Sequence, residues 1–386
     1  MSGLVDARGV TFRHVYVHVP FCARRCSYCD FSIAVRRVVP VEDFVQALAG
    51  ELAARFGEPP ALSHERTRID TLYLGGGTPS RLGGDGVVDA IAAVRRYASV
   101  DESTEVTIEA NPEDVTAAIV AQWVGAGVNR VSLGVQSFDP QVLAWMHRTH
   151  DVAAVHAALD ALAAGGIANW SLDLIYALPG EVPRDWARDL DAAIALEPTH
   201  LSAYGLTVES GTPLARWRER GAIHDADEER YERDFLLAHE RLEAAGFDHY
   251  EVSNWGRRSL ESRHNSCYWR GVPYLGLGPA AHGFDGDTRR WNEREYVRWL
   301  ERTRTGSDPM GGSEQLTESQ RALEAVYVGL RTSQGVMIAQ SDALVVDRWI
   351  AEGWGSVAEG RLRLTPRGWL RLDALVAALT EHRSRY

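Results

Sequence analysis

Three cysteines lie close together near the start of the chain. Of the four cysteines in the 386 residues, Cys22, Cys26 and Cys29 have the spacing C-x3-C-x2-C. Three thiolates on one short loop can bind three irons of a cubic [4Fe–4S] cluster and leave the fourth iron without a protein ligand. An open coordination position distinguishes a reactive metal site from a closed structural one. The spacing therefore favours a cluster with one free iron.

A structural zinc site is the alternative for the same three cysteines. His18 or Cys267 would then be the fourth ligand. Zinc sites usually consist of two separated pairs of ligands, and this spacing is not of that kind. The arrangement of three clustered cysteines and one distant cysteine does not match a disulfide framework either. They are typical of a reducing compartment, so we expect a cytoplasmic protein.

The elements that must position the cysteine loop are strands alternating with helices. Helical, Ala/Leu-rich stretches separate short β-rich runs, which predicts a parallel sheet covered by helices. Six units are too few for a complete eight-stranded barrel, so we expect an α/β fold with a partial, open (β/α)6 barrel. The predicted strands are Val15–Val19, Ile69–Leu74, Glu105–Glu109, Arg130–Val135, Trp170–Ile175 and His200–Gly205.

Polar and glycine residues follow these strands at the end where parallel β/α folds bind ligands. Singly, each fits a tight turn, a surface group or a cap. Together they converge on one rim, where acids can bind ribose hydroxyls and an arginine can bind a carboxylate, as a nucleotide requires. These residues are Gly76, Gly77 and Thr78 after the second strand, Glu109 at the third, Gln136 and then Arg148 after the fourth, and Asp173 at the fifth.

The pattern changes beyond residue 215. A charged helical stretch precedes an irregular segment rich in Gly, Trp and Tyr, and a Gly-containing break is predicted at Ser307–Ser313. The tail then shows two helices, a β-hairpin and a last helix, which resembles a winged-helix module. We expect three parts: the barrel at residues 10–245, a connecting segment at 246–312, and a winged-helix-like α+β domain at 313–386.

The charge pattern excludes several functions. All 41 basic residues are arginine, and 53 acidic residues give a net charge of −12. Without lysine, Schiff-base chemistry and lysine-dependent phosphate sites are excluded. A net-acidic chain is a poor binder of nucleic acid, so no nucleic-acid partner is expected. Only the winged-helix-like tail, with Arg361, Arg363, Arg367 and Arg371, favours a nucleic-acid-binding regulator.

Membrane insertion is not expected either. No run of 18 apolar residues occurs, and residues 1–12 lack the apolar region of a targeting segment. We therefore expect no transmembrane segment, with any membrane association made through partners.

Motifs along nearly the whole chain resemble the HemN/HemW group of radical SAM proteins. They include YVHVPFC, YLGGGTPS, TIEANPE, RVSLGVQSF, HRTH, SLDLIYALPG, LSAYGLTVE and HNSCYW. The resemblance implies a [4Fe–4S] cluster whose fourth iron is chelated by S-adenosylmethionine, which the reduced cluster cleaves to a deoxyadenosyl radical. The nucleotide-binding residues that it implies are Tyr16, Tyr28, Gly76, Gly77, Thr78, Glu109, Gln136, Arg148 and Asp173.

This group has two branches. One consists of oxygen-independent coproporphyrinogen III dehydrogenases, which oxidatively decarboxylate two propionates. The other consists of haem chaperones that deliver haem to respiratory haem proteins. The dehydrogenases have a further cysteine where this chain has Phe31, and a longer extension before the cysteine loop than the 21 residues here. The resemblance is therefore to the chaperone branch, with the dehydrogenase as alternative; S-adenosylmethionine cleavage stays open, as does a homodimer.

The H-N-x-x-Y-W motif of the chaperone branch is present at residues 264–269. The resemblance associates it with haem: imidazole is a common axial ligand, and Tyr268 and Trp269 offer flat faces to a macrocycle. The alternative is that both aromatics belong to the core and that His264 is a capped loop histidine. Cys267 could ligate iron as a thiolate or be a small buried hydrophobe.

A second histidine belongs to the same expected haem site. His282 lies in the sequence GPAAHG and is a further candidate for a haem-proximal residue. Chaperones often have glycine at the position of Ala280 in this motif, and the sequence alone gives no consequence of that difference.

Overall fold

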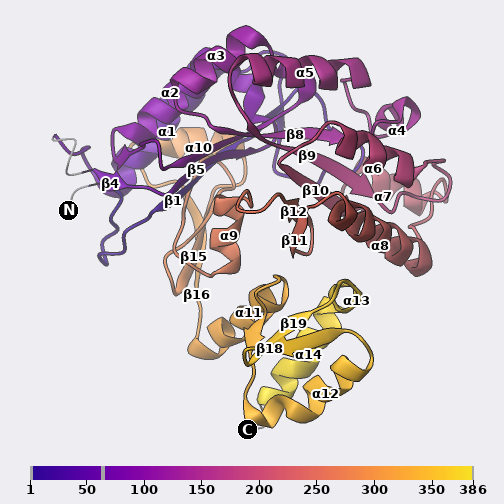
Figure 1. Cartoon of the computed structure of the whole chain (residues 1–386). Helices are drawn as coiled ribbons and strands as arrows, with labels where there is room; N and C mark the ends of the chain where they lie inside the picture. Colours follow the sequence, from indigo (N-terminus) through magenta and orange to yellow (C-terminus); the bar gives the residue numbers. More distant parts are fainter. Residues whose placement is uncertain (1–2, 62–65, 385–386) are drawn as a thin grey trace.

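Six parallel strands form the centre of the molecule. The computed structural model describes residues 3–61 and 66–384. One nine-stranded sheet has the order β11-β12-β10-β9-β8-β7-β5-β1-β13, and it does not close into a barrel (Figure 1). All six predicted strands are present within two residues at each end, so the predicted fold class is confirmed. They are β1 (His14–Val19), β5 (Thr71–Gly76), β7 (Glu105–Ala110), β8 (Arg130–Gln136), β9 (Asn169–Tyr176) and β10 (His200–Gly205).

Helices cover the outer face of this sheet, in the upper part of Figure 1. Several of them begin after an Asp or Thr whose side chain accepts a hydrogen bond from the first turn, as Asp151 does from the backbone N–H of Ala154 (2.8 Å). The helices are α1 (Val41–Phe56), α2 (Gly83–Arg95), α3 (Ala117–Gly125), α4 (Pro140–Trp145), α5 (Val152–Ala164), α6 (Trp186–Ala195), α7 (Pro213–Glu219) and α8 (Glu228–Ala244).

The segment expected to connect two domains also extends the sheet. Strands β11 (Asp248–Glu251) and β12 (Asn254–Gly256) are antiparallel and follow β10, whereas β13 (Leu275–Leu277) lies parallel beside β1. Sequence reasoning treated this range as a connector because each strand has only three or four residues, too few to show a clear hydrophobic period. The helix α9 (Arg263–Trp269) lies between them in sequence.

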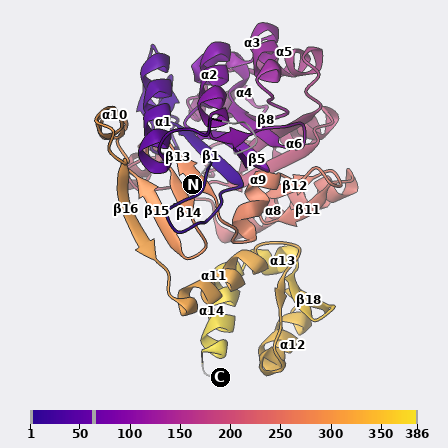
Figure 2. The same cartoon turned by 90° about the vertical axis from the view of Figure 1, so that its left-hand side faces the viewer.

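A second, three-stranded sheet covers part of the inner face. It consists of β14 (His282–Phe284), β15 (Thr288–Asn292) and β16 (Met310–Gln315), with α10 (Tyr296–Arg304) between the last two (Figure 2). The break predicted at Ser307–Ser313 is therefore wrong from residue 310 onward. Gly312 opposes Trp291 across the pair of strands, where a side chain would collide with the indole ring. Glycine here allows close packing rather than ending a strand.

The C-terminal domain has the predicted order of helix, helix, hairpin and helix. A three-stranded sheet, β17-β19-β18, packs among its helices, and Figures 1 and 2 show the domain below the large sheet. Its elements are α11 (Glu318–Leu330), β17 (Val336–Met337), α12 (Ala343–Ala351), β18 (Gly355–Ala358), β19 (Arg361–Leu364), α13 (Pro366–Trp369) and α14 (Leu372–Arg383).

Two arginines of the expected wing are used in packing. The guanidinium of Arg361 donates to the carbonyls of Gln334 (2.8 Å) and Gly335 (2.7 Å). The guanidinium of Arg371 lies over the ring of Trp354, 5.2 Å from its centroid. Both cations thus stabilise the domain itself.

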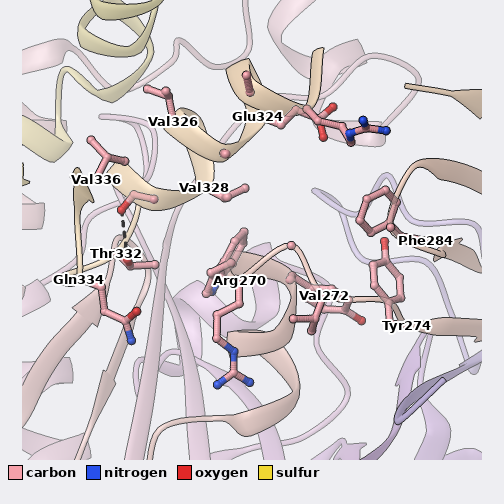
Figure 3. Close-up of a pocket in the computed structure, with 18 of the residues that line it drawn as sticks. Arg270, Val272, Tyr274, Phe284, Glu324, Val326, Val328, Thr332, Gln334 and Val336 are labelled. Carbon is pink, nitrogen blue, oxygen red and sulfur yellow. Dashed lines mark hydrogen bonds between the residues drawn. The ribbon is translucent and has the colours of Figure 1, made fainter. Parts of the chain in front are cut away.

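Between the C-terminal domain and the rest of the molecule lies a large cavity. Figure 3 shows Glu324, Val326 and Val328 of α11 across from Arg270 and Val272, which follow α9. The cavity is therefore made by two domains that are far apart in sequence.

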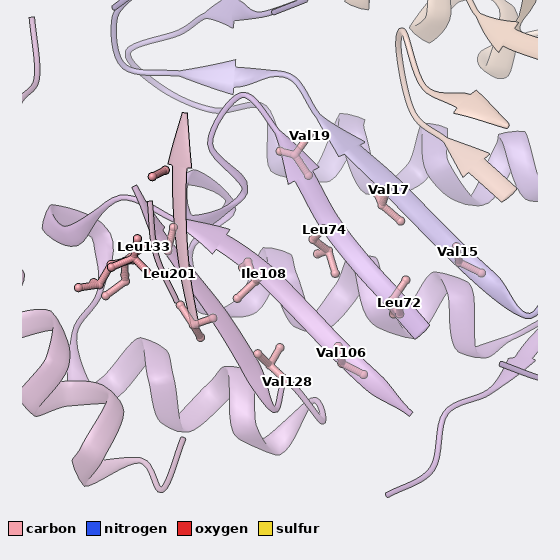
Figure 4. Close-up of a cluster of buried hydrophobic side chains, with 14 of the residues drawn as sticks. Val15, Val17, Val19, Leu72, Leu74, Val106, Ile108, Val128, Leu133 and Leu201 are labelled. Carbon is pink, nitrogen blue, oxygen red and sulfur yellow. The ribbon is translucent and has the colours of Figure 1, made fainter. Parts of the chain in front are cut away.

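Alternation along the strands divides the sheet into an apolar outer face and a polar inner one. Val15, Val17 and Val19 of β1 point towards the helices, as Leu72 and Leu74 of β5 do (Figure 4). The residues between them, among them Tyr16, His18 and Tyr73, lie on the other face because successive side chains of a strand alternate. The core thus lies between sheet and helices, and the inner face is left for ligands.

Two of the expected domain ranges extend beyond the described residues. The ranges 10–245 and 313–386 include residues 62–65 and 385–386, which lie outside the described residues. Across the part of the chain that the structure describes, no helix has both the length and the apolar composition to cross a membrane.

Candidate functional site

A cavity of about 530 Å³ lies at the carboxyl ends of the central strands. Eleven of the twelve residues predicted to bind the cluster and the nucleotide line it, because parallel strands bring their carboxyl ends to one edge. The twelfth, Tyr16, lines two neighbouring cavities instead. The eleven are Cys22, Cys26, Tyr28, Cys29, Gly76, Gly77, Thr78, Glu109, Gln136, Arg148 and Asp173.

Backbone hydrogen bonds hold both ends of the cysteine loop. Two short strands flank it, β2 (Phe21–Cys22) and β3 (Ala34–Val35), and they pair in parallel. The N–H of Arg36 donates to the carbonyl of Cys22 (2.9 Å). Cys22 is buried, whereas Cys26 and Cys29 are half-buried. The loop thus presents its three thiols from a fixed base.

The donor arrangement fits a cluster better than a zinc ion. Within residues 3–61 and 66–384, no group of three His, Cys, Asp or Glu side chains converges tightly enough to bind one metal ion. Zinc needs all its ligands within about 2.0–2.3 Å of a single ion, whereas a cubic cluster binds each cysteine to a different iron. His18 is not free to be a zinc ligand, since its Nε2 donates to the carbonyl of Ser32 (3.0 Å) and its Nδ1 accepts from the Tyr16 hydroxyl (3.1 Å).

Burial makes two of the three thiols harder to ionise than an ordinary cysteine. Burial raises the pKa of Cys22, and it raises the pKa of Cys29 to about 11. Iron binding must therefore displace these protons, as thiolate ligation requires.

The glycine loop lies against the cysteine loop. A side chain at Gly77 would meet the backbone of Pro20 and the sulfur of Cys22, about 3 Å away, and one at Gly76 would collide with the ring of His18. Gly76 also has φ +117°, which other residues rarely adopt. These glycines therefore allow close approach between two loops of the protein. The Thr78 hydroxyl lies 3.4 Å from the Cys22 sulfur.

Two carboxylates occupy the inner face. Glu109 accepts hydrogen bonds from the Tyr73 hydroxyl (2.8 Å) and the N–H of Gly76 (3.0 Å), and burial raises its pKa to about 7. Asp173 accepts from the Ser132 hydroxyl (3.1 Å), and burial raises its pKa as well. Acceptors in this position suit ribose hydroxyls.

Arg148 brings a cation to the same cavity. Its guanidinium donates to the Asn111 side chain (2.6 Å), to the carbonyl of Gly134 (2.7 Å) and to the sulfur of Cys26 (3.5 Å). Its Nε is buried and has no hydrogen-bond partner among the described residues. A buried donor without a partner is costly unless a ligand supplies the acceptor. The cavity therefore fits an anionic group bound beside the cysteine loop.

Sequence reasoning missed several residues of this site. Asn111, which orients Arg148, follows Glu109 by two residues in the motif EANP. Tyr204 and Thr207 line the cavity at the end of β10, and Ser132 lines it on β8. The signal for the last three was available, since the rule applied to five strand ends also covers the sixth strand and the alternate residues of β8.

The second cavity is larger, at about 1090 Å³, and its walls are mostly apolar. Tyr268 and Trp269 of α9 line it, and Figure 3 shows Val328 of α11 across from Arg270 and Val272, which follow α9. Arg270 and Arg321 also line it, and neither makes an ion pair within the described residues. The indole Nε1 of Trp269 is buried and has no partner there. This cavity suits a flat apolar ligand that carries acidic groups.

Only some of the residues expected to bind haem line the large cavity. Tyr268, Trp269 and His282 line the large cavity, whereas His264 and Cys267 do not. His264 is buried, and its two ring nitrogens lie 2.7 Å from the Thr71 hydroxyl and 2.8 Å from the Tyr268 hydroxyl. Cys267 is also buried, which raises its pKa to about 12.

A third cavity of about 570 Å³ shares lining residues with each of the other two. It shares Tyr16, His18 and His282 with the large cavity, and Glu109 and Phe31 with the cysteine-lined one. Tyr16 thus stands between the two sites rather than in the nucleotide site alone.

Comparisons with known proteins agree with this architecture. The sequence model described as "Radical SAM superfamily" matches residues 16–193. Among solved structures, coproporphyrinogen III oxidase (HemN) from Escherichia coli has a TM-score of 0.76 and 20% sequence identity, covering 95% of this chain and 89% of that chain. That likeness shows the fold alone. The fold and the cysteine-lined cavity define a protein of the radical SAM class.

Similar sequences specify the family within that class. A "Heme chaperone HemW" from Mycobacterium tuberculosis (strain ATCC 25618 / H37Rv) is 40% identical, covering 98% of this chain and 97% of its own. The "Heme chaperone HemW" of Escherichia coli (strain K12) is 32% identical, covering 94% of this chain and 96% of its own. The chain therefore belongs to the HemW family of radical SAM proteins.

Proposed function

We propose that this protein is a haem chaperone that binds haem in the large cavity and holds a [4Fe–4S] cluster with S-adenosylmethionine in the cysteine-lined one. The observation that carries the proposal is the presence of two unlike cavities in one chain. One presents three thiols beside buried polar groups; the other presents aromatic and aliphatic walls with free cations. A haem needs walls of the second kind, because its macrocycle is apolar and its two propionates are anionic.

In the large cavity, each part of a haem has a counterpart. Tyr268, Trp269 and Val328 line this cavity and would pack against the macrocycle. Within the described residues Arg270 and Arg321 make no ion pair, so each could bind one propionate, and the Nε1 of Trp269, which has no partner there, is a further donor. Haem is the cargo in this proposal, and respiratory haem proteins are its acceptors.

In the smaller cavity, Cys22, Cys26 and Cys29 would bind three irons of the cluster. Arg148 would bind the carboxylate of the nucleotide, and Glu109 and Asp173 would accept hydrogen bonds from its ribose, with Gln136, Tyr28 and the loop at Gly76, Gly77 and Thr78 completing the walls. The chemistry that a reduced cluster supplies when bound is one electron for cleavage of the sulfonium. Hydrogen bonds to the Asn111 side chain and the Gly134 carbonyl keep Arg148 in place.

Haemin titration of the purified protein, with and without its reconstituted cluster, tests the proposal. We expect a saturable Soret band in both preparations. The same preparations, given S-adenosylmethionine, a reductant and coproporphyrinogen III under anaerobic conditions, should form no protoporphyrinogen. Its appearance would identify a dehydrogenase and overturn the chaperone proposal, whereas absence of haem binding would remove its basis.

Self-association, membrane association through partners and lack of nucleic-acid binding stay predictions. Gel filtration with and without haem addresses the first of these. Partition with membranes that contain an acceptor addresses the second. Retention on DNA at low salt addresses the third, since binding to phosphates weakens steeply with salt.

A further inference from the structure

We infer that His282 is the haem iron ligand, and that His264 of the H-N-x-x-Y-W motif is a positioning residue that holds Tyr268 in the cavity wall. This inference rests on the proposed function, because it specifies how haem is bound in the large cavity. It assigns the two histidines of the expected haem site to different roles.

His264 is not available to iron. It is 1% exposed and does not line the large cavity. One of its nitrogens lies 2.7 Å from the Thr71 hydroxyl, and the other lies 2.8 Å from the Tyr268 hydroxyl. An imidazole must offer a free lone pair to a metal, and both nitrogens here are engaged in short hydrogen bonds. Ligation by His264 would require breaking one of them and moving α9.

The bond from His264 gives Tyr268 its orientation. The two rings meet edge to face, with centroids 5.1 Å apart and an interplanar angle of 88°. Tyr274 packs against Tyr268 in the same manner, at 4.7 Å and 77°. With its hydroxyl fixed on His264, the Tyr268 ring can move little and stands as a firm wall of the cavity. The motif histidine thus acts on haem through a tyrosine.

His282 has the opposite properties. Its side chain is exposed on β14, and it lines both the large cavity and the cavity that leads to Glu109. No hydrogen bond within the described residues engages its ring. Trp291 lies opposite on β15, with its ring stacked at 5.9 Å and 28° from that of His282, so the imidazole is oriented without using its nitrogens. A neutral, oriented imidazole with a free nitrogen is what haem iron takes as an axial ligand.

Other candidates for the ligand are less suitable. His18 lines the large cavity, but both of its nitrogens are hydrogen-bonded, to the Tyr16 hydroxyl and to the Ser32 carbonyl. Cys267 is 0% exposed and does not line the cavity, and its thiol is neutral. Among the nitrogen and thiol groups that were expected at this site, His282 alone combines exposure to the cavity with a free ring.

The test is haemin titration of full-length variants, followed by the Soret band and by electron paramagnetic resonance. His282→Ala should weaken haem binding by roughly tenfold or more, because a lost ligand costs at least as much as a lost outer partner of a ligand. Its Soret band should shift, and added imidazole should restore the wild-type spectrum. His156→Ala, on the exposed face of α5, is the matched control and should change nothing.

A second pair of variants tests the positioning role. His264→Gln and Tyr268→Phe should each keep the wild-type Soret position and spin state, with affinity lowered roughly twofold to tenfold, as expected for one hydrogen bond. The double variant should lose no more than either single one, since both remove the same bond. Imidazole should rescue neither.

Each outcome decides the inference. An unchanged spectrum in His282→Ala, or an imidazole-rescued spectral change in a His264 variant, would overturn it. Thermal unfolding of each variant shows whether a loss of affinity comes from misfolding, and the spectrum of the haem that still binds remains informative in that case. If the wild-type protein itself binds no haem, the proposed function fails, which is a distinct result.

Discussion

The two main cavities differ in what makes their walls. The cysteine-lined cavity lies at the ends of strands of a single sheet, and neighbouring strands are joined by continuous backbone ladders. The large cavity lies between two domains, which are joined by side-chain contacts and by a short antiparallel backbone bridge between Glu251 and Thr332. The guanidinium of Arg331 bonds to Glu251 (2.9 Å) and lies over Trp269 (4.5 Å), and Arg289 bonds to Glu324 (2.6 Å).

This difference lies in how each cavity is held. Displacing the cysteine loop would break backbone hydrogen bonds at both of its ends. Moving the C-terminal domain would break the backbone bridge between Glu251 and Thr332 and the Arg331–Glu251 ion pair, whose carboxylate is buried. The Arg289–Glu324 pair is partly exposed and contributes about 0–1 kcal/mol. The cysteine-lined cavity thus lies within one domain, whereas the large cavity depends on the packing of two.

Removing a cluster ligand should affect the cysteine-lined cavity and leave the large cavity nearly unchanged, and this is the largest effect that we expect. Cys22→Ala should abolish the brown absorbance of the reconstituted cluster and the cleavage of S-adenosylmethionine, because three thiolates are the minimum for this loop. Haem affinity should change by less than about threefold, since Cys22 does not line the large cavity. Cys267→Ala is the control and should keep the cluster. Joint loss of haem binding in Cys22→Ala would show that the two sites are not separable.

A charge introduced into the large cavity should weaken haem binding and leave the cluster unchanged. Val328→Glu places a carboxylate on the wall of the cavity that Tyr268 and Trp269 also line, and it should weaken haem binding by about tenfold or more through desolvation and repulsion of propionates. Leu323→Glu, on the same helix but 50% exposed and outside the cavity, should have little effect. The iron content of the reconstituted cluster, measured before haem is added, should be unchanged in both variants. Equal losses of haem affinity in the two would contradict the position assigned to the haem.

Protonation of Glu109, in the cysteine-lined cavity, should make the stability of the folded protein depend on pH. Its pKa is about 7 in the folded protein and 4.5 in an ordinary glutamate, so folding favours the protonated form. The resulting stabilisation, roughly 3 kcal/mol at 1.36 kcal/mol for each unit, is complete below pH 4.5 and is lost as the pH rises through 7. Glu109→Gln should flatten the dependence of the urea midpoint between pH 5 and 8. If the variant kept the same pH dependence of the urea midpoint, that dependence would belong to another titratable group.

The smallest expected effect concerns Ala280. This residue has φ +58°, in the left-handed region that favours glycine. That conformation explains why chaperones of the resembled branch often have glycine there, a difference that the sequence alone left without consequence. Ala280→Gly should raise the free energy of unfolding by about 0.5 kcal/mol, since relief of strain outweighs the greater entropy of glycine in the unfolded chain. A lower urea midpoint in the variant would contradict this account.

The central fold could be predicted because its signals are local and repeated. Strand β10 has the predicted bounds, and the other five central strands lie within two residues of theirs, since the apolar pattern of a strand lies within the segment itself. The cysteine loop was identified by its spacing, and the residues around Glu109 by the rule that ligands gather where parallel strands end. Strand β13 escaped prediction because three residues pair with β1, about 260 positions earlier in the chain.

The sequence by itself thus determined the open parallel sheet, the winged-helix-like arrangement of the tail and the grouping of eleven residues around one cavity. Only the tertiary structure decided which face each domain presents to the other, and hence the large cavity, the burial of His264 and the exposure of His282. The physical reason is the range of the interactions: side-chain alternation and capping act over a few residues, whereas the packing of α9 against β5 and α11 depends on segments that meet only in the folded chain.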